Sequence, residues 1–255
     1  MNQSSKLLRN LVILILGGTQ EASELAKKAS LLPNLEIKVS LAGRTRQPVA
    51  SKSSRVGGFG GVAGLTQYLQ SENIDLVIDA THPFATQISD NAAIAAEKLG
   101  LPRLMLIRSP WKSIKGDNWI EVENIQAAAE ILPDIAKRVF LTIGRQEITA
   151  FAQVENIWCL MRMIEKPSTD ILLPKGLLLL ERGPFDKDIE KQLLQKHNID
   201  TIVSKNSGGD ATYAKIQAAR ELGIKVVMVK RPMLPKGETV EDVEAALEWV
   251  IGNSY

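Results

Sequence analysis

The sequence predicts an α/β protein with two domains, each of which places helices on both faces of a parallel sheet. Short apolar runs alternate with segments of helical periodicity along the chain, and this alternation is typical of right-handed βαβ units. The length of 255 residues exceeds that of one average domain. A stretch of the first half is also echoed in the second half, which indicates two units of similar design.

The first half begins with a predicted strand and helix. Residues 11–16 are apolar without interruption, which predicts a strand that is buried on both faces. Residues 20–31 repeat small and apolar side chains on one helical face. A helix expected at 84–99 ends at Gly100, because glycine readily adopts the left-handed conformation of a C-cap. The other elements expected here are strands at 36–41, 74–79 and 103–107 and a helix at 61–70.

The second half repeats the alternation of strands and helices. Its apolar runs predict strands, and the amphipathic segments between them predict helices. The strands are expected at 138–143, 157–163, 177–180, 201–204 and 225–229, and the helices at 186–196, 211–222 and 241–251.

Two short stretches resemble each other across the halves. Asn73-Ile74-Asp75 matches Asn198-Ile199-Asp200, and each stretch leads into a strand, a polar loop and a helix that ends in Leu-Gly. We therefore expect two Rossmann-like three-layer α/β/α domains, at residues 1–135 and 136–255, with a boundary near Pro133. The alternative is that βαβ units resemble one another in general, so that the match carries no such meaning.

The echoed strands also predict where a ligand binds. The polar segments 79–83 and 204–209 both leave the carboxyl end of a strand, where open α/β sheets bind ligands. We expect an active site in a cleft between the two domains, because such clefts are favoured places for a substrate.

The composition excludes several classes of partner. The chain carries 31 Lys and Arg against 29 Asp and Glu, a balance that does not suit a general polyanion binder. Aromatic residues make up 5%, which argues against stacking platforms for nucleic acid. No apolar run reaches the ~20 residues of a membrane span. We expect no nucleic acid or membrane partner, and a monomer or weak homo-oligomer.

The N-terminus and the cysteine content bear on localisation and metal binding. Lys6 and Arg9 precede the apolar run 11–16, but that run is shorter than the ~7–15 residues of a signal peptide, and no cleavage pattern follows. We expect a cytoplasmic protein. Cys159 is the single cysteine and stands in an apolar run, which predicts a buried, inert thiol and no cysteine metal site. No metal site is expected.

A glycine-rich turn joins the first strand to the first helix. Gly17-Gly18-Thr19-Gln20-Glu21 stands where dinucleotide-binding folds hold a pyrophosphate, because glycines allow close approach and the helix N-terminus offers free N–H groups. The segment is not G-x-G-x-x-G, and a tight turn without a ligand is the alternative. Its place between the first strand and the first helix favours a cofactor site.

The end of the second predicted strand distinguishes two cofactors. In dinucleotide folds an acidic residue there binds the ribose 2′-hydroxyl of NADH, whereas arginine suits the 2′-phosphate of NADPH. Here Arg44-Thr45-Arg46 follows the strand, without a carboxylate. This predicts NADPH, with NADH as the alternative; a solvated basic loop is the interpretation without a ligand.

Two further segments at strand ends are candidates for ligand contact. Gly57-Gly58-Phe59-Gly60-Gly61 can approach a flat ligand, or form a mobile lid or an irregular turn. Thr81-His82-Pro83 places His82 as a proton donor or cofactor contact, or simply starts the next helix with Pro83 at its first position. His197 ends a helix and is expected to be solvated.

The sequence shows no nucleophile elbow, Walker loop or paired carboxylates, whereas hydride transfer needs only a positioned nicotinamide and a proton source. Taken in order, its motifs resemble those of the precorrin-6A reductase family and its cobalt-precorrin-6A counterpart, of cobalamin biosynthesis. The resemblance covers nearly the whole chain. Beyond the segments above it rests on Gly144-Arg145-Gln146, Glu181-Arg182-Gly183-Pro184-Phe185, Lys205-Asn206-Ser207-Gly208-Gly209 and Arg231-Pro232.

The resemblance implies NAD(P)H-dependent reduction of a ring double bond of the tetrapyrrole (cobalt-)precorrin-6A to (cobalt-)precorrin-6B. The N-terminal domain would bind the cofactor and the C-terminal domain the substrate, whose carboxylates basic side chains can pair with. The expected cofactor contacts are Gly17, Gly18, Thr19, Gln20, Glu21, Arg44, Thr45, Thr81 and His82. The expected substrate contacts are Gly58, Phe59, Gly60, Arg145, Arg182, Lys205, Asn206, Ser207, Gly208 and Arg231. The proton donor is open among His82, Lys205, Tyr213 and water.

Two other function classes remain as alternatives. A non-catalytic nucleotide-sensing module would bind the nucleotide without oxidising NADPH when a tetrapyrrole is added. A methyltransferase that uses S-adenosylmethionine also has a glycine-rich first loop, but would be favoured by an acidic residue at the end of the second strand, which residues 40–45 lack.

Overall fold

The computed structural model describes residues 9–41 and 54–253, and the chain forms two compact units. The first unit comprises Met1–Arg108 and Met233–Tyr255, and the second comprises Ser109–Pro232. Each unit contains one six-stranded sheet in which all strands are parallel. The predicted α/β class with parallel sheets is confirmed.

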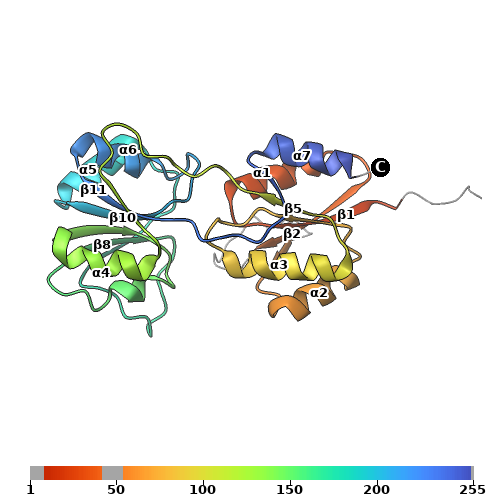
Figure 1. Ribbon diagram of the computed structural model, residues 1–255, viewed down its shortest axis with the longest axis horizontal. Coiled ribbons are helices and arrows are strands. Elements are labelled where there is room, and N and C mark those ends of the chain that lie inside the picture. Colours follow the sequence, from red (N-terminus) through yellow and green to blue (C-terminus); the bar gives the residue numbers. More distant parts are fainter. Residues whose placement is uncertain (1–8, 42–53, 254–255) are drawn as a thin grey trace, which may run out of the picture. The chain divides into compact units, whose positions relative to one another are not determined.

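The first unit has the strand order β12-β5-β4-β1-β2-β3 (Figure 1). With β12 counted as the sixth strand, this is the 3-2-1-4-5-6 order of doubly wound dinucleotide-binding folds. Two helices cover each face of this sheet: α1 and α7 one face, α2 and α3 the other. The strands are β1 (Leu11–Leu16), β2 (Leu35–Leu41), β3 (Ser54–Val56), β4 (Leu76–Asp79), β5 (Arg103–Leu106) and β12 (Glu238–Val240), and the helices are α1 (Gln20–Ala29), α2 (Gly61–Ser71), α3 (Thr86–Leu99) and α7 (Val243–Gly252).

The central strand β1 explains why its sequence is apolar throughout. Ile13 and Ile15 pack in the cluster beneath α1 and α7, whereas Leu14 and Leu16 pack in the cluster beneath α2 and α3. All four side chains are at most 2% exposed. A strand with helices on both faces buries both sets of alternating side chains, as the uninterrupted apolar run predicted.

The second unit has the strand order β6-β11-β10-β7-β8-β9, in which β7 to β11 follow the same pattern as β1 to β5. Helices α5 and α6 cover one face, and α4 with the short 3₁₀ helix η1 covers the other (Figure 1). The strands are β6 (Trp119–Val122), β7 (Arg138–Thr142), β8 (Trp158–Met163), β9 (Gly176–Leu180), β10 (Thr201–Lys205) and β11 (Lys225–Val229), and the helices are α4 (Ile125–Ile135), η1 (Ile148–Phe151), α5 (Lys187–Lys196) and α6 (Ala214–Leu222).

The repeated Asn-Ile-Asp stretches perform the same structural task in both units. Asn73 and Asn198 have positive φ angles of 50° and 49°, and each ends the helix before it. The Asp75 carboxylate accepts from Val12 N–H in β1 at 2.9 Å, and the Asp200 carboxylate accepts from the N–H groups of Lys137 and Arg138 at the start of β7, both at 3.0 Å. The echo in the sequence therefore corresponds to a repeated architecture.

The division of the chain corrects the expected boundary between residues 135 and 136. β6 pairs with β11 in the second unit, and β12 pairs with β5 in the first. The chain therefore enters the second unit after Arg108 and returns to the first after Pro232. Pro133, near which the sequence predicts the boundary between the two domains, lies near the end of α4. β6, which precedes the expected boundary, therefore belongs to the second sheet. β12, which follows it, belongs to the first sheet.

The two predicted helices that follow β4 and β10 begin later than expected. α3 starts at Thr86 rather than at residue 84, because Ala85 N–H donates to the His82 carbonyl and closes a turn first. α6 starts at Ala214 rather than at residue 211, because Tyr213 N–H donates to the Asp210 carbonyl. Both extra turns lie at carboxyl ends of strands and lengthen the loops there.

Candidate active site

The turn between β1 and α1 lies at the centre of the carboxyl edge of the first sheet. Gly17 N–H donates to the Ser40 carbonyl at 2.8 Å, which ties the turn to β2. Thr19 caps α1: its Oγ1 accepts from Ala22 N–H at 3.1 Å and donates to the Ala80 carbonyl at 2.7 Å. The predicted turn is thus held by β2 on one side and by the chain after β4 on the other.

Gly18 opens this turn to a ligand. Its φ of +117° belongs to a region that residues with a side chain rarely adopt, and a Cβ there would meet no atom within 4 Å. The first N–H groups of an α-helix have no intrahelical acceptor. Since Thr19 satisfies that of Ala22, those of Gln20 and Glu21 are left for an anion. An open glycine beside these N–H groups fits a diphosphate.

The charge at the start of α1 is balanced within the first unit. The Glu21 carboxylate forms an ion pair with Arg108 Nη1 at 2.8 Å, and both side chains are largely buried. Arg108 follows β5, the next strand but one from β1 in the sheet. The pair keeps the carboxylate of Glu21 from repelling an anion at the helix N-terminus.

The loop after β4 holds Thr81 and His82 beside the turn. Asp79 is 3% exposed and accepts hydrogen bonds from Thr81 N–H at 3.1 Å and from Thr81 Oγ1 at 2.7 Å. His82 Nδ1 accepts from Phe84 N–H at 3.2 Å. A neutral imidazole that accepts at Nδ1 carries its proton on Nε2. His82 is therefore held in the tautomer that can donate from Nε2.

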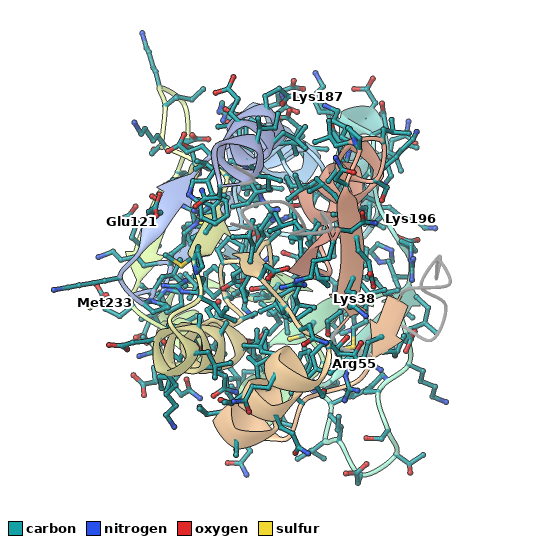
Figure 2. The ribbon with its side chains drawn as sticks, turned by 90° about the vertical axis from the view of Figure 1, so that its right-hand side faces the viewer. Lys38, Arg55, Glu121, Lys187, Lys196 and Met233 are labelled. Carbon is teal, nitrogen blue, oxygen red and sulfur yellow. The ribbon has the colours of Figure 1, made fainter. Side chains whose placement is uncertain are left out.

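The predicted contacts on the β2 and β3 side are only partly described. Arg44 and Thr45 lie outside the described residues. The exposed Arg55 on β3 (labelled in Figure 2) lies over the ring of Phe59 in the following loop, at 4.9 Å, and donates to the Gly58 carbonyl at 3.1 Å. Gly60 has a φ of +80°, which favours glycine. The glycine-rich segment thus forms a turn that leads into α2.

In the second unit, the predicted basic contacts surround the carboxyl edge of the sheet. Lys205 ends β10, and its Nζ forms an ion pair with the Glu147 carboxylate. Arg145 Nη1 lies 3.3 Å from a Glu165 carboxylate oxygen. Arg182 is exposed in the loop after β9. Lys205 and Arg145 are therefore held by carboxylates, which limits the positions they can take.

Asn206, Ser207, Gly208 and Arg231 lie together in the second unit. The Asn206 side chain is bonded to the backbone of Trp111, and Arg231 donates to the carbonyls of Asn206 and Ser207. Gly208 has a φ of +68°. The predicted substrate loop is thus held both by the predicted residue Arg231 and by Trp111, which the sequence did not indicate.

Tyr213 is held by side-chain contacts within the second unit. Its hydroxyl oxygen accepts from Arg220 Nη2 at 2.7 Å, and Arg220 is paired with the nearly buried Asp117 at 2.8 Å. Its ring lies 5.5 Å from that of Trp111. These contacts give Tyr213 a packing role that the sequence did not indicate.

A buried charge cluster in the second unit was not predicted. Arg162 on β8 and Glu190 on α5 are 8% and 0% exposed and form two hydrogen bonds, at 2.5 and 2.8 Å. The Arg162 guanidinium lies 3.6 Å from the centre of the Phe185 ring. Lys215 on α6 is 5% exposed. The available signal was a charged residue within an apolar pattern: Arg162 stands between Met161 and Met163.

Lys215 makes the stability of the protein depend on pH. Burial, together with the smaller effect of the Arg162 charge, lowers the pKa of Lys215 from 10.5 to about 7, although Glu190 opposes the shift. Between these two pH values the unfolded chain binds the proton and the folded protein does not, so stability rises with pH by up to ~1.4 kcal/mol per unit. The substitution Lys215→Met removes this pH dependence of the stability.

The variant Lys215→Met is expected to be more stable than the parent protein at pH 7, and this advantage is expected to shrink as the pH approaches 10. Urea unfolding at pH 7, 8, 9 and 10 measures the difference. A difference that stays constant over this range would show that Lys215 does not change protonation on unfolding.

Cys159 is the single cysteine, and it is buried on β8. It is 1% exposed, and burial raises the pKa of its thiol to about 12. The predicted burial of the thiol is confirmed. In the described part of the chain, no three His, Cys, Asp or Glu side chains are grouped to hold a metal ion, and no helix is both long and apolar enough to cross a membrane.

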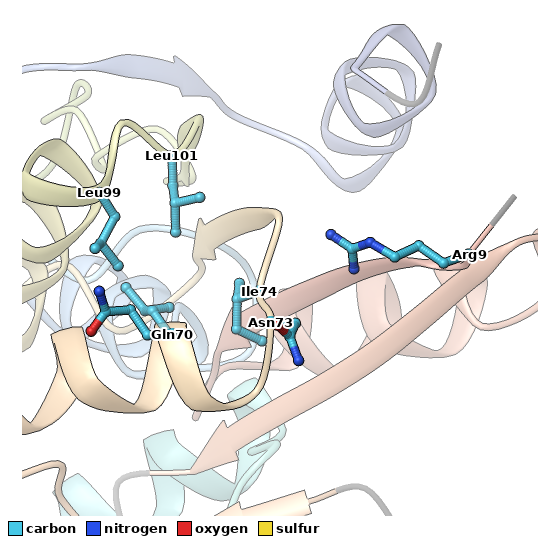
Figure 3. Close-up of a pocket in the computed structure, with 7 residues that line it drawn as sticks. Arg9, Gln70, Asn73, Ile74, Leu99 and Leu101 are labelled. Atoms are coloured by element: carbon cyan, nitrogen blue, oxygen red, sulfur yellow. The ribbon is translucent and has the colours of Figure 1, made fainter. Parts of the chain in front are cut away.

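A pocket of the first unit lies away from these loops (Figure 3). It is lined by Arg9 before β1, by the end of α2 and by Leu99 and Leu101 around the end of α3. These segments precede the strands, so the pocket lies at the amino edge of the sheet. It includes no predicted site residue, and parallel α/β sheets bind ligands at the carboxyl edge.

Comparison with known proteins agrees with the resemblance seen in the sequence. The family model described as precorrin-6x reductase CbiJ/CobK matches residues 12–251. The precorrin-6A reductase of Rhodococcus erythropolis is 48% identical over 240 residues, which cover 93% of this chain and 96% of that protein. The precorrin-6A reductase of Mycobacterium tuberculosis H37Rv is 46% identical, covering 94% and 97%.

More distant relatives and a solved structure extend the comparison. The cobalt-precorrin-6A reductase of Priestia megaterium is 26% identical and covers 92% of this chain and 98% of that protein. A solved structure of a CobK precorrin-6A reductase superimposes with a TM-score of 0.89 at 40% identity, covering 95% of this chain and 97% of that one.

Proposed function

The chain belongs to the precorrin-6x reductase CbiJ/CobK family, and from that premise we propose that it is an oxidoreductase that reduces one ring double bond of precorrin-6A with NADPH, giving precorrin-6B. The observation that carries the cofactor assignment is the open Gly18 turn at the N-terminus of α1, in a sheet with the strand order of dinucleotide-binding folds. The proposed setting is cobalamin biosynthesis in the cytoplasm.

The metal-free substrate is favoured over the cobalt-loaded one. Five relatives named precorrin-6A reductase are 41–48% identical to this chain, whereas those named cobalt-precorrin-6A reductase are 26–31% identical. We therefore take precorrin-6A as the substrate, with cobalt-precorrin-6A as the alternative.

The first unit is the proposed cofactor unit. Gly17, Gly18 and Thr19 bring the backbone to the diphosphate, and the N–H groups of Gln20 and Glu21 bind its oxygens. Thr81 and His82 border the same turn, since Ala80 N–H donates to the Leu16 carbonyl at 2.9 Å. Bound NADPH supplies a hydride to a ring carbon of the substrate.

The second unit is the proposed substrate unit. The substrate carries carboxylates around a flat ring, and Arg145, Arg182 and Lys205 all lie in or beside loops that follow strands. Such side chains bind carboxylates through charge-assisted hydrogen bonds. Gly58, Phe59 and Gly60 of the first unit are proposed to contact the flat ring. Catalysis then depends mainly on holding ring and cofactor in register.

The reduction requires a proton as well as a hydride. The hydride adds to one carbon of the double bond and a proton adds to its neighbour, so that a saturated CH–CH pair forms. His82 is the proposed donor: its imidazolium form gives a proton to the ring carbon and returns to the neutral form, whose Nδ1 accepts from Phe84 N–H. Lys205, Tyr213 and water are the other donors that the sequence leaves open.

His82→Asn is expected to lower kcat by ~10²-fold, because a positioned general acid contributes at least that factor. An asparagine oxygen can still accept from Phe84 N–H, so the loop is preserved while the acid is removed. Steady-state kinetics with precorrin-6A measure the effect. A turnover within threefold of the parent would exclude His82 as the donor and direct attention to Lys205 and water.

Arg44→Ala is expected to raise the KM for NADPH far more than the KM for NADH, because only NADPH carries the 2′-phosphate that the guanidinium is proposed to bind. Kinetics with both coenzymes provide the measurement, and Arg46→Ala is the matched control for general loss of positive charge in this segment. Equal increases for both coenzymes would remove this role from Arg44.

Anaerobic incubation with NADPH and precorrin-6A tests the function as a whole. Loss of nicotinamide absorbance with a change in the visible spectrum of the tetrapyrrole is expected, and cobalt-loaded substrate in a parallel sample tests the choice of metal state. Nucleotide binding without oxidation on addition of either tetrapyrrole would instead identify a nucleotide-sensing module.

A further inference from the structure

Both segments that connect the two units are bonded to one loop of the second unit. The chain enters this unit at Ser109 and leaves it at Pro232. We call residues 109–111 the entry segment, residues 230–232 the exit segment, and residues 205–209, which begin with the last residue of β10, the β10 loop. Among the described residues, hydrogen bonds link this loop to the entry segment and to the exit segment.

Asn206 fastens the β10 loop to the entry segment. Its side chain is 9% exposed. Its Oδ1 accepts from Trp111 N–H at 2.8 Å, and its Nδ2 donates to the Trp111 carbonyl at 2.9 Å. Trp111 Nε1 in turn donates to the Gly209 carbonyl at 2.7 Å. The amide group of Asn206 thus uses both its oxygen and its nitrogen on the backbone of a single residue.

Arg231 fastens the same loop to the exit segment. Its Nε donates to the Asn206 carbonyl at 2.8 Å, and its Nη2 donates to the Ser207 carbonyl at 3.0 Å. Two donors of the guanidinium, including one that a carboxylate would need for bidentate binding, are therefore directed to the loop backbone.

Gly208 shows how closely the three segments pack. A Cβ at this residue would lie 2.2 Å from the Ser109 carbonyl oxygen and 2.4 Å from Arg231 Nη2. Both distances are shorter than real Cβ contacts, and the φ of +68° also favours glycine. The entry segment, the loop and the exit segment are therefore in direct contact at this residue.

We propose that Asn206 and Arg231 are positioning residues, which lock the β10 loop to the entry and exit segments and so place Lys205 and Ser207 for the substrate, instead of contacting the substrate themselves. This inference rests on the proposed function, in which the macrocycle binds at the second unit. It revises the expectation from the sequence that Asn206 contacts the substrate and that Arg231 binds a substrate carboxylate. It also means that the loop and the two connecting segments order together.

Amide hydrogen exchange of the ligand-free protein tests this role without any need for activity. In Asn206→Ala and Arg231→Lys, the amides of Trp111 and of the β10 loop are expected to exchange about tenfold faster than in the parent, since each loses hydrogen bonds that hold the loop. Arg182→Gln is the matched control, because Arg182 is exposed and proposed to contact the substrate directly; its exchange is expected to be unchanged.

Kinetics then separate positioning from contact. Arg231→Lys keeps the positive charge but cannot donate to both carbonyls. If Arg231 positions the loop, Arg231→Lys and Arg231→Ala raise the KM for precorrin-6A equally, by about tenfold, and leave the KM for NADPH unchanged. If Arg231 binds a carboxylate, the lysine variant retains most of the affinity, and the proposal fails.

The exchange result is independent of the reaction. Unchanged exchange at Trp111 and the β10 loop in both variants would overturn the positioning role even in an active reductase. If the variants exchange faster but the parent protein does not oxidise NADPH, the positioning role is supported and only the proposed function is refuted. If Asn206→Ala does not fold, Arg231→Lys alone decides the outcome, because it preserves the charge and most of the side-chain volume.

Discussion

Gly18→Val is expected to weaken NADPH binding by about 1,000-fold while the protein stays folded. The valine side chain would enter the open space beside the first N–H groups of α1, which is where the diphosphate is proposed to lie. Loss of two charge-assisted hydrogen bonds, each of ~1.5–3 kcal/mol, accounts for an effect of this size. Titration of the nicotinamide fluorescence with purified protein measures the dissociation constant.

Gly100→Val is the matched control for this experiment. Gly100 also has a positive φ, +63°, and a Cβ there would likewise meet no atom within 4 Å. It caps the C-terminus of α3, before β5, and thus lies at the amino edge of the same sheet. It should lose stability without losing NADPH affinity. A Gly18→Val protein that binds NADPH within threefold of the parent would show that the diphosphate does not lie at this turn.

Arg162→Met is expected to lower the free energy of unfolding by ~3–5 kcal/mol, because it leaves the fully buried Glu190 carboxylate without its partner. The lost contact between the guanidinium and the Phe185 ring adds to the effect. Urea or guanidinium unfolding at pH 7 gives the difference. Such a loss removes a large part of the stability of an ordinary domain.

Two further variants show whether the uncompensated charge causes this loss. Arg162→Met combined with Glu190→Leu should recover much of the stability, because the buried carboxylate is removed as well. Lys187→Met breaks a pair with Glu221 whose side chains are both 39% exposed, and little change is expected there. If Arg162→Met loses no more stability than Lys187→Met, burial of the ion pair does not determine the cost of breaking it.

Much of the fold could be predicted from local sequence. The uninterrupted apolar run of β1 and the C-cap at Gly100 depend on neighbouring residues only, and both were predicted. β12 was missed because three residues, of which Glu238 is exposed, carry no strand pattern. β6 and α4 were missed for a similar reason: β6 is short and partly exposed, and Pro133 interrupts the helical pattern of α4.

The candidate site was predictable where it depends on strand ends. Glycines between a strand and a helix indicate a backbone that can receive an anion, and the turn at Gly17 to Thr19 has this form in the structure. The roles of Asn206 and Arg231 were not predictable in the same way. Their partners are Trp111 and the loop backbone, and Trp111 lies 95 residues from Asn206 along the chain.

The sequence by itself determined the two βαβ series, the glycine turn after the first strand and the family, because these are set by residues close together in the chain. Only the tertiary structure decided that β6 pairs in the second sheet and β12 in the first. It also decided that Arg162, Glu190 and Lys215 are all buried in the second unit. The physical reason is that strand pairing and charge burial depend on which distant segments meet, and the pattern of a single segment does not encode its partner.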